Sequence, residues 1–208
     1  AASVGETLGR IHAATAADPE CAEKFANDLI FYDIRLEPYL VATGQAHPDL
    51  ADIFARLVQV TAETRRVLVH GDVSPKNILI GPDGPVFLDA ESAWFGDPAF
   101  DLAFCLNHLL LKCLWSPDST VLLLDSFGVL AARYLARVDW EDPAGLDART
   151  AQLLPGLLLA RIDGKSPVEY LTDENDRNTV RNAARAMLDG PVESLGEIRA
   201  YWREMLRE

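Results

Sequence analysis

The stretch Val67-Leu-Val-His-Gly-Asp72-Val-Ser-Pro-Lys-Asn77-Ile-Leu-Ile80 decides the fold of this 208-residue chain. It holds two short apolar runs, residues 67–69 and 78–80, on either side of a polar loop. A Gly-Pro-Asp-Gly-Pro turn then leads into a third apolar run, residues 86–88, which ends on Asp89. Short apolar runs bounded by turn residues are typical of strands, so this order predicts strand, loop, strand, turn and strand.

The predicted hairpin brings an amide and a carboxylate together. If residues 78–80 pair with residues 86–88, Asn77 at the start of one strand lies close to Asp89 at the end of the other. Amide and carboxylate oxygens are ligands that Mg²⁺ takes when substrate phosphates and water complete its shell. Asp72 lies on the loop five residues before Asn77, where it could accept a proton from a hydroxyl nucleophile. Phosphoryl transfer needs this combination of a positioned base and a metal.

Three sequence blocks in this region resemble a known family. The blocks are His70-Gly-Asp72-x-x-x-x-Asn77, the strand-ending Asp89, and Gly96-Asp97-Pro-Ala-Phe-Asp101-Leu-Ala. Together they resemble the catalytic and metal-binding loops of the aminoglycoside phosphotransferase and choline kinase superfamily, the small-molecule branch of the protein-kinase-like fold. Each block alone is a weak signal, but three blocks in this order and at these separations are specific.

The resemblance implies a role for each matching residue. Asp72 would be the catalytic base, while Asn77 and Asp89 would hold Mg²⁺ and, through it, the phosphates of ATP as co-substrate. Lys76 could neutralise charge on the nucleotide or lie on the surface, and the sequence leaves both open. Support of the catalytic loop is implied for His70 and for Asp101, the latter through hydrogen bonds to the loop backbone. Glu91 could assist the metal site, line the acceptor pocket or be structural.

The spacing after Asp89 favours a small acceptor. Protein kinases place a long activation segment after the metal-binding aspartate to dock a polypeptide, whereas Gly96-Asp97-Pro98 follows Asp89 almost at once here. Asp89-Ala-Glu91 also replaces the Asp-Phe-Gly of protein kinases, so no phenylalanine switch is inferred. Asp97 is placed to cap a helix that begins at Pro98.

The rest of the chain is predicted to be helical, so the fold class is mostly α with a small β element (α+β). A capping box formed by Ser3 and Glu6 would open the first helix, and Asp18-Pro19 a second one with Phe25, Leu29 and Ile30 facing inward. Further helices are predicted over residues 33–44, 47–60, 98–114, 119–137, 146–162, 175–188 and 194–207, with a kink at Pro155.

The resemblance covers residues 1–208 as one helical C-terminal lobe, with the catalytic and metal loops at residues 67–104. No glycine-rich hairpin and no Val-Ala-x-Lys-like strand precede Ser3. The N-terminal nucleotide-binding lobe of the family is therefore expected to be absent from this chain, and this piece alone should bind nucleotide poorly.

Composition limits the partners. The net charge is −13 and the isoelectric point about 4.7, which argues against nucleic acid and anionic membranes as partners. An acidic surface suits a small, hydroxylated, possibly cationic acceptor, although solubility explains it equally well. There is no apolar run long enough to span a membrane and no secretory signal, and three cysteines match no zinc or redox motif. A cytoplasmic protein with reduced thiols is the expectation.

The segment Arg161-Ile-Asp163-Gly-Lys165-Ser has two interpretations. Gly-Lys-Ser is found in phosphate-binding loops, but Leu159 stands where that motif needs a glycine, so this interpretation is rejected. Arg161, Asp163 and Lys165 could instead line the acceptor pocket or form surface ion pairs.

Two other functions compete with a kinase. The chain could be a non-catalytic kinase-like module that binds a metabolite or protein, although nothing would then need to keep the three site residues. It could also resemble a haloacid-dehalogenase-like phosphatase through Asp89-Ala-Glu91, but such enzymes need alternating strands and helices afterwards, and only helices are predicted here. The acceptor itself is not named by the sequence.

Overall fold

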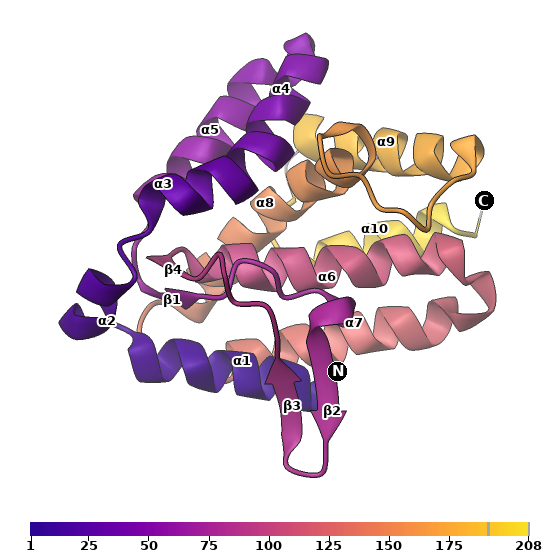
Figure 1. The fold of residues 1–208 in the computed structure, drawn as a ribbon. Coiled ribbons are helices and arrows are strands. Elements are labelled where there is room, and N and C mark those ends of the chain that lie inside the picture. Colours follow the sequence, from indigo (N-terminus) through magenta and orange to yellow (C-terminus); the bar gives the residue numbers. More distant parts are fainter. Residues whose placement is uncertain (191, 208) are drawn as a thin grey trace.

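Helix α6 (Pro98–Trp115) is the buried axis of the structure, a computed structural model that describes residues 1–190 and 192–207. Most of its side chains are buried, and it packs against α7 (Thr120–Leu135) and α8 (Pro143–Asp163) (Figure 1). Its sequence is apolar nearly all round, which is what a helix enclosed on every side requires. The helix predicted over residues 98–114 is confirmed.

The start of α6 is fixed by Asp97, as predicted. The Asp97 carboxylate accepts a hydrogen bond from Ala99 N–H at 3.0 Å, and Pro98 occupies the first helical position. Asp97 also pairs with Arg149 of α8 at 3.0 Å. The cap therefore ties the first turn of α6 to the neighbouring helix.

The remaining helices surround α6, and the described structure is mostly helical (Figure 1). Two of them, α1 and α7, pack side by side, and α9 lies along α8. Their bounds are α1 Ala2–Thr15, α2 Pro19–Lys24, α3 Asp28–Phe31, a π-helical segment η1 Tyr32–Val41, α4 Ala42–Ala46, α5 Ala51–Glu63, α9 Glu174–Asp189 and α10 Leu195–Met205, with single turns at Pro48–Leu50, Pro75–Asn77 and Pro117–Ser119.

Two small antiparallel sheets complete the fold. Strand β2 (Ile78–Gly81) pairs with β3 (Gly84–Phe87) in the predicted hairpin, which projects from the helical body (Figure 1). Gly84 has φ +111°, a conformation that favours glycine and closes the tight turn. Strand β1 (Val67–Val69) pairs with β4 (Trp94–Gly96), which the sequence did not predict.

Three predictions near the N-terminus are wrong. Helix α1 begins at Ala2, so Ser3 lies inside the helix and caps nothing. Helix α2 starts at the Asp18 cap as expected but ends at Lys24. A new helix, α3, begins at Asp28, so the side chains after Lys24 no longer continue the angular spacing of α2. Leu29 and Ile30 are consequently 80% and 50% exposed instead of facing inward.

The predicted third helix is longer than expected and has an unusual centre. Residues 28–46 run through α3, η1 and α4 without a break. Pro38 lies inside this run and has no N–H to donate to the preceding turn. Wider π-helical turns accompany it.

Other sequence predictions can be compared directly. Cys105 and Cys113 are buried on α6, as expected, and all three cysteines are free. Helix α8 continues through Pro155 to Asp163, and the predicted kink stays a prediction. Within the described residues, no helix combines the length and apolar character needed to cross a membrane.

Candidate active site

The catalytic loop runs from the end of β1 to the start of β2, and a glycine allows its first turn. Gly71 has φ +82°, a conformation that L side chains rarely adopt. A Cβ at this position would lie 2.5 Å from Ser92 Oγ, and Ser92 Oγ itself donates to the His70 carbonyl at 3.1 Å. The loop is thus held closely against the segment before β4, and only glycine fits at its turn.

Asp101 of α6 holds the backbone of this loop. Its carboxylate accepts hydrogen bonds from His70 N–H at 2.7 Å and from Gly71 N–H at 2.8 Å, and the residue is fully buried. His12 Nε2 lies 3.3 Å from the same carboxylate, and His12 Nδ1 lies 2.7 Å from Tyr134 Oη. Helices α1, α6 and α7 therefore converge on one buried acceptor that fixes the loop.

His70 occupies a supporting position. Its Nδ1 accepts a hydrogen bond from Asp72 N–H at 3.1 Å, and its ring packs edge-on against Phe87 at 6.1 Å between centroids. The imidazole therefore shapes the turn that leads to Asp72.

Asp72 lies at the bottom of a depression and is only 8% exposed. Its Oδ2 is 3.3 Å from Arg35 Nη2 and 4.0 Å from Lys76 Nζ. Arg35 extends from η1 and also donates to the Gly71 carbonyl through Nε. Two cations thus flank the carboxylate on the loop.

Sequence reasoning missed Arg35 and His12. Arg35 lies 36 residues before the loop carbonyl that it contacts, and His12 lies 89 residues before Asp101. No local pattern marks either side chain as a partner of the loop.

Asn77 connects the catalytic loop to the hairpin. Its side-chain Nδ2 donates a hydrogen bond to the backbone carbonyl of Asp72 at 3.2 Å. The backbone carbonyl of Asn77 accepts a hydrogen bond from Leu88 N–H at 2.8 Å. The second bond extends the hairpin by one pair beyond Ile78 and Phe87, so Asp89 directly follows a residue bonded to Asn77. Asn77 was expected to lie close to Asp89, and the backbone brings it into contact with Leu88, the neighbour of Asp89. That the two side chains face one ion stays a prediction.

Asp89 itself is exposed and has φ +66°. Positive φ is uncommon outside glycine, costs free energy and concentrates at functional sites. Here it turns the chain sharply at the end of the hairpin, immediately beside Asn77.

The donor set suits a magnesium ion that shares its shell with a substrate. One carboxylate and one amide oxygen are hard ligands, and Mg²⁺ characteristically keeps several positions for water and phosphates. Among the described residues, no cluster of three or more His, Cys, Asp or Glu side chains could hold a metal ion alone. An ion at Asn77 and Asp89 would therefore depend on nucleotide phosphates.

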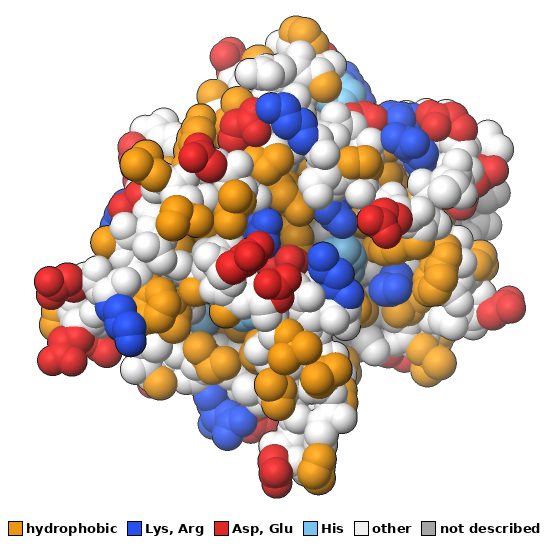
Figure 2. Space-filling view, viewed as in Figure 1, with side chains coloured by type: hydrophobic (Ala, Val, Ile, Leu, Met, Phe, Trp, Pro, Cys, Tyr) orange, Lys and Arg blue, Asp and Glu red, His pale blue; other side chains and the backbone are white. Residues whose placement is uncertain are grey.

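A cavity of about 330 Å³ opens from Asp72 toward α6 and the end of α8. Figure 2 shows lysine and arginine side chains gathering around a histidine near the centre of this face, beside red carboxylates. The lining residues are Tyr39, Asp72, Ser74, Pro75, Lys76, Phe104, His108, Lys112, Arg161, Ser166, Pro167, Glu169 and Tyr170.

His108 is a neutral group in this wall. Burial, and then the positive charges of Arg161, Lys112 and Lys76, lower the pKa of His108 to about 3. Its Nδ1 lies 3.0 Å from Tyr170 Oη, and burial raises the pKa of that phenol to about 12. The pair therefore contributes hydrogen-bonding capacity and no charge near neutral pH.

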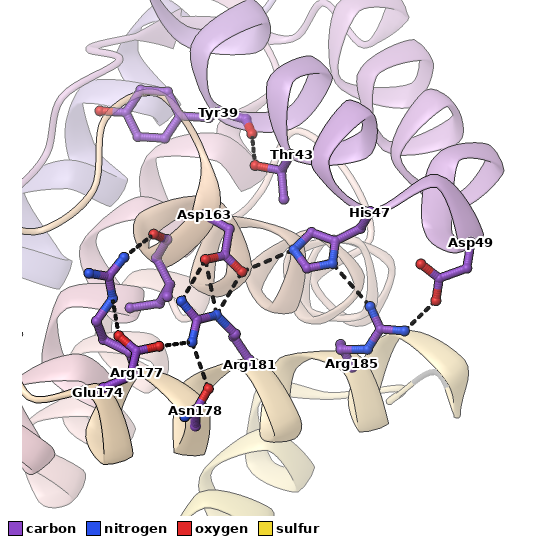
Figure 3. Close-up of polar contacts among 11 residues, drawn as sticks. Tyr39, Thr43, His47, Asp49, Asp163, Glu174, Arg177, Asn178, Arg181 and Arg185 are labelled. Atoms are coloured by element: carbon purple, nitrogen blue, oxygen red, sulfur yellow. Dashed lines mark hydrogen bonds and ion pairs between the residues drawn. The ribbon is translucent and has the colours of Figure 1, made fainter.

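The four residues expected near the acceptor do not lie together. Arg161 lines the cavity. Asp163 instead binds Arg181 at 2.9 Å and His47 at 3.0 Å, in a network between α8 and α9 (Figure 3). Lys165 pairs with Glu37, and Glu91 is exposed just after Asp89. Two residues along a helix is about 200° of rotation, which explains why Arg161 and Asp163 face opposite ways.

Asp163 and Lys165 both form ion pairs, which agrees with the alternative given for them in the sequence analysis.

The segment Gly164-Lys-Ser166 was rejected above as a phosphate-binding loop. It follows helix α8 instead of a strand, and Gly164 N–H is already bonded to the Ala160 carbonyl at 3.0 Å. The geometry of a phosphate-binding loop, which needs a strand before and a helix after it, is not present.

A comparison with family models shows the family of the chain. Residues 1–111 match the model of the phosphotransferase enzyme family, just over half of the 208-residue chain. The chain belongs to the phosphotransferase enzyme family. The match includes Asp72, Asn77, Asp89 and Asp101 and ends within α6. No curated protein matches the chain.

The family match covers only one side of the candidate site in this phosphotransferase. Its loop, hairpin and loop-holding aspartate fall within the family match, which supports a kinase-like enzyme in general terms. Lys112, Arg161 and Tyr170, on the far side of the cavity, lie beyond the matched residues. The chemistry of these wall side chains, and not the family match, therefore bears on which acceptor binds.

Proposed function

We propose that this chain is the C-terminal catalytic lobe of a protein-kinase-like phosphotransferase. It would transfer the γ-phosphoryl group of ATP, with Mg²⁺, to a hydroxyl of a small molecule. Such transfer requires little covalent chemistry from the protein, so positioning and electrostatic stabilisation carry it. The proposal includes a nucleotide-binding lobe in the full-length protein, as the family resemblance implies.

The observation that carries the proposal is the linkage between loop and hairpin. Asp101 fixes the backbone just before Asp72, and the Asn77 amide fixes the carbonyl of Asp72 itself. The hydrogen bond from Leu88 to Asn77 then sets the start of Asp89. Four hydrogen bonds, three of them involving the side chain of Asp101 or Asn77, thereby connect the segments that carry the base and the candidate metal ligands. This connection supports a shared reaction centre.

In the proposed reaction, the acceptor hydroxyl oxygen attacks the γ-phosphorus. The new P–O bond forms as the bond to the bridging oxygen of ADP breaks, and the hydroxyl proton passes to Asp72. Asn77 and Asp89 would hold Mg²⁺, which neutralises charge on the phosphates when bound. Arg35 keeps the Asp72 carboxylate oriented before the acceptor arrives.

Asp89→Asn in the full-length protein should sharply weaken the binding of the Mg²⁺ that ATP turnover requires. An amide oxygen is a neutral and poorer ligand than a carboxylate, so the Mg²⁺ concentration for half-maximal rate should rise by roughly tenfold to a hundredfold. The measurement is ADP release in a Mg²⁺ titration, with a panel of hydroxylated small molecules as acceptors.

Asp83→Asn is the matched control, because Asp83 is an exposed carboxylate in the turn of the same hairpin. It should leave the Mg²⁺ titration unchanged. An unaltered titration for Asp89→Asn would refute its role as a ligand. Nucleotide and acceptor binding by calorimetry, without ADP release under any condition, would favour the alternative of a non-catalytic kinase-like binding module.

A further inference from the structure

The cavity beside Asp72 contains two partly buried cations that no carboxylate neutralises. Lys112 of α6 and Arg161 of α8 both line it, and neither forms an ion pair within 4.0 Å among the described residues. Partly buried charges cost free energy unless a counter-charge or hydrogen bonds compensate them. The lining as a whole, with Lys76, Lys112 and Arg161 against Asp72 and Glu169, is net positive.

Elsewhere in the described chain, partly buried arginines are paired. Each of the others has a carboxylate within 4.0 Å; these are Arg35, Arg149, Arg177, Arg181, Arg185 and Arg199. In a chain with net charge −13, carboxylates are plentiful. That Lys112 and Arg161 lack one is therefore a local feature of this cavity.

Protein contacts hold both cations at the wall without using all of their hydrogen-bonding groups. Lys112 Nζ lies 4.5 Å from the Trp115 ring centroid and 4.8 Å from that of Tyr170. Arg161 Nη1 donates to Tyr39 Oη at 3.1 Å, while Arg161 Nε is buried without a partner. Contacts with aromatic faces orient a cation but do not neutralise it.

A buried neutral group completes the wall. His108 is only 5% exposed, and its Nε2 is buried without a hydrogen-bond partner among the described residues. The other ring nitrogen, Nδ1, is hydrogen-bonded to Tyr170 Oη at 3.0 Å. An unpaired buried polar atom is costly, so a ligand that bonds to Nε2 would recover free energy.

The position of the cations separates them from the metal side. Neither Asn77 nor Asp89 lines this cavity, whereas Asp72 and Lys76 do. The two cations and the candidate metal ligands thus border different parts of the site. A ligand in the cavity would place its own groups between Asp72 and Arg161.

We infer that the acceptor carries an anionic group, a carboxylate or a phosphate, in addition to the hydroxyl that is phosphorylated. The anion is bound by Arg161 and Lys112, with His108 Nε2 as a neutral partner, and the hydroxyl faces Asp72. This inference rests on the proposed function and specifies its substrate class. It replaces the cationic acceptor that the overall charge favoured, because the local charge of a cavity decides which ligand enters it.

Calorimetric titration of the full-length protein without nucleotide tests the inference. The probes are sodium glycolate and glycerol phosphate, each with a hydroxyl and an anion, and glycerol and ethanolamine as neutral and cationic counterparts. At least one anionic probe should bind roughly tenfold or more tightly than both counterparts, since charge-assisted hydrogen bonds are the stronger kind. Comparing the two anionic probes distinguishes a carboxylate from a phosphate.

Variants locate the binding. Lys112→Gln should weaken the binding of the preferred anionic probe by roughly tenfold, whereas Lys112→Arg should keep most of the affinity. Lys24→Gln is the matched control, because Lys24 is exposed on α2 and outside the cavity. Arg161→Gln tests the second cation of the same site by the same titration. Thermal melting of each variant shows whether the fold is intact.

Three results would overturn the inference. Ethanolamine or glycerol could bind as tightly as both anionic probes, Lys112→Gln and Arg161→Gln could leave the affinity unchanged, or a non-hydrolysable Mg-ATP analogue could exclude the anion completely. The last result would assign the cations to the nucleotide. Because these titrations contain no ATP, they can fail while Asp72-dependent transfer to another acceptor survives. Anion binding with no transfer to any acceptor would refute the proposed function instead.

Discussion

Asp72→Asn in the full-length protein is expected to lower kcat by roughly a hundredfold to ten-thousandfold, the usual contribution of a positioned general base. The change keeps the size of the side chain but removes the basic oxygen. Arg35 loses its counter-charge, yet it retains its bond to the Gly71 carbonyl. The loop backbone should therefore remain in place, with a melting temperature close to that of the unchanged protein.

The measurement is steady-state ADP release with the best acceptor, alongside thermal melting. Asp118→Asn is the control, because Asp118 is an exposed aspartate in the turn after α6. It should leave both quantities unchanged. Near-normal turnover for Asp72→Asn would remove Asp72 from the chemical step.

Asp101→Ala should cause the largest loss of stability. The carboxylate is fully buried, and its removal leaves the N–H groups of His70 and Gly71 without their acceptor. It also takes away the partner of His12. Each buried group left unsatisfied costs about 1–3 kcal/mol, so the free energy of unfolding should fall by about 3–5 kcal/mol.

Chemical denaturation measures this loss, with Asp125→Ala as the matched control. Asp125 forms an exposed ion pair with Arg199, and such pairs contribute at most about 1 kcal/mol. A loss for Asp101→Ala no larger than that of the control would contradict the loop-holding role. If the variant remains folded, its kcat should also fall, because the backbone that carries Asp72 is released.

Local patterns predicted the hairpin and its consequences. Two apolar runs and a glycine-rich turn fixed the pairing of β2 with β3, and this pairing brings Asn77 next to Leu88. The Asp97 cap was equally readable, because an acid before proline at the start of an apolar run has few other uses. These features depend on residues close together in sequence.

Features that depend on distant residues were not predicted. Strand β4 has only three residues and is defined by its partner β1. Val67 pairs with Gly96, 29 positions later, in a register that no local pattern encodes. Ser3 and Glu6 match a capping box in sequence, yet the helix starts one residue before them. The charge of the cavity is likewise invisible in the sequence, because it depends on which cations lack carboxylate neighbours in space.

The most direct test of the central claim is to locate the metal ion. Crystals of the full-length protein grown with Mn²⁺ and a non-hydrolysable ATP analogue would reveal it by anomalous scattering. The account predicts a peak at coordination distance, roughly 2.1 Å, from Asn77 Oδ1 and an Asp89 carboxylate oxygen, with Asp72 facing the γ-phosphate from the opposite side. A bound metal–nucleotide whose peak lies away from both residues would contradict it.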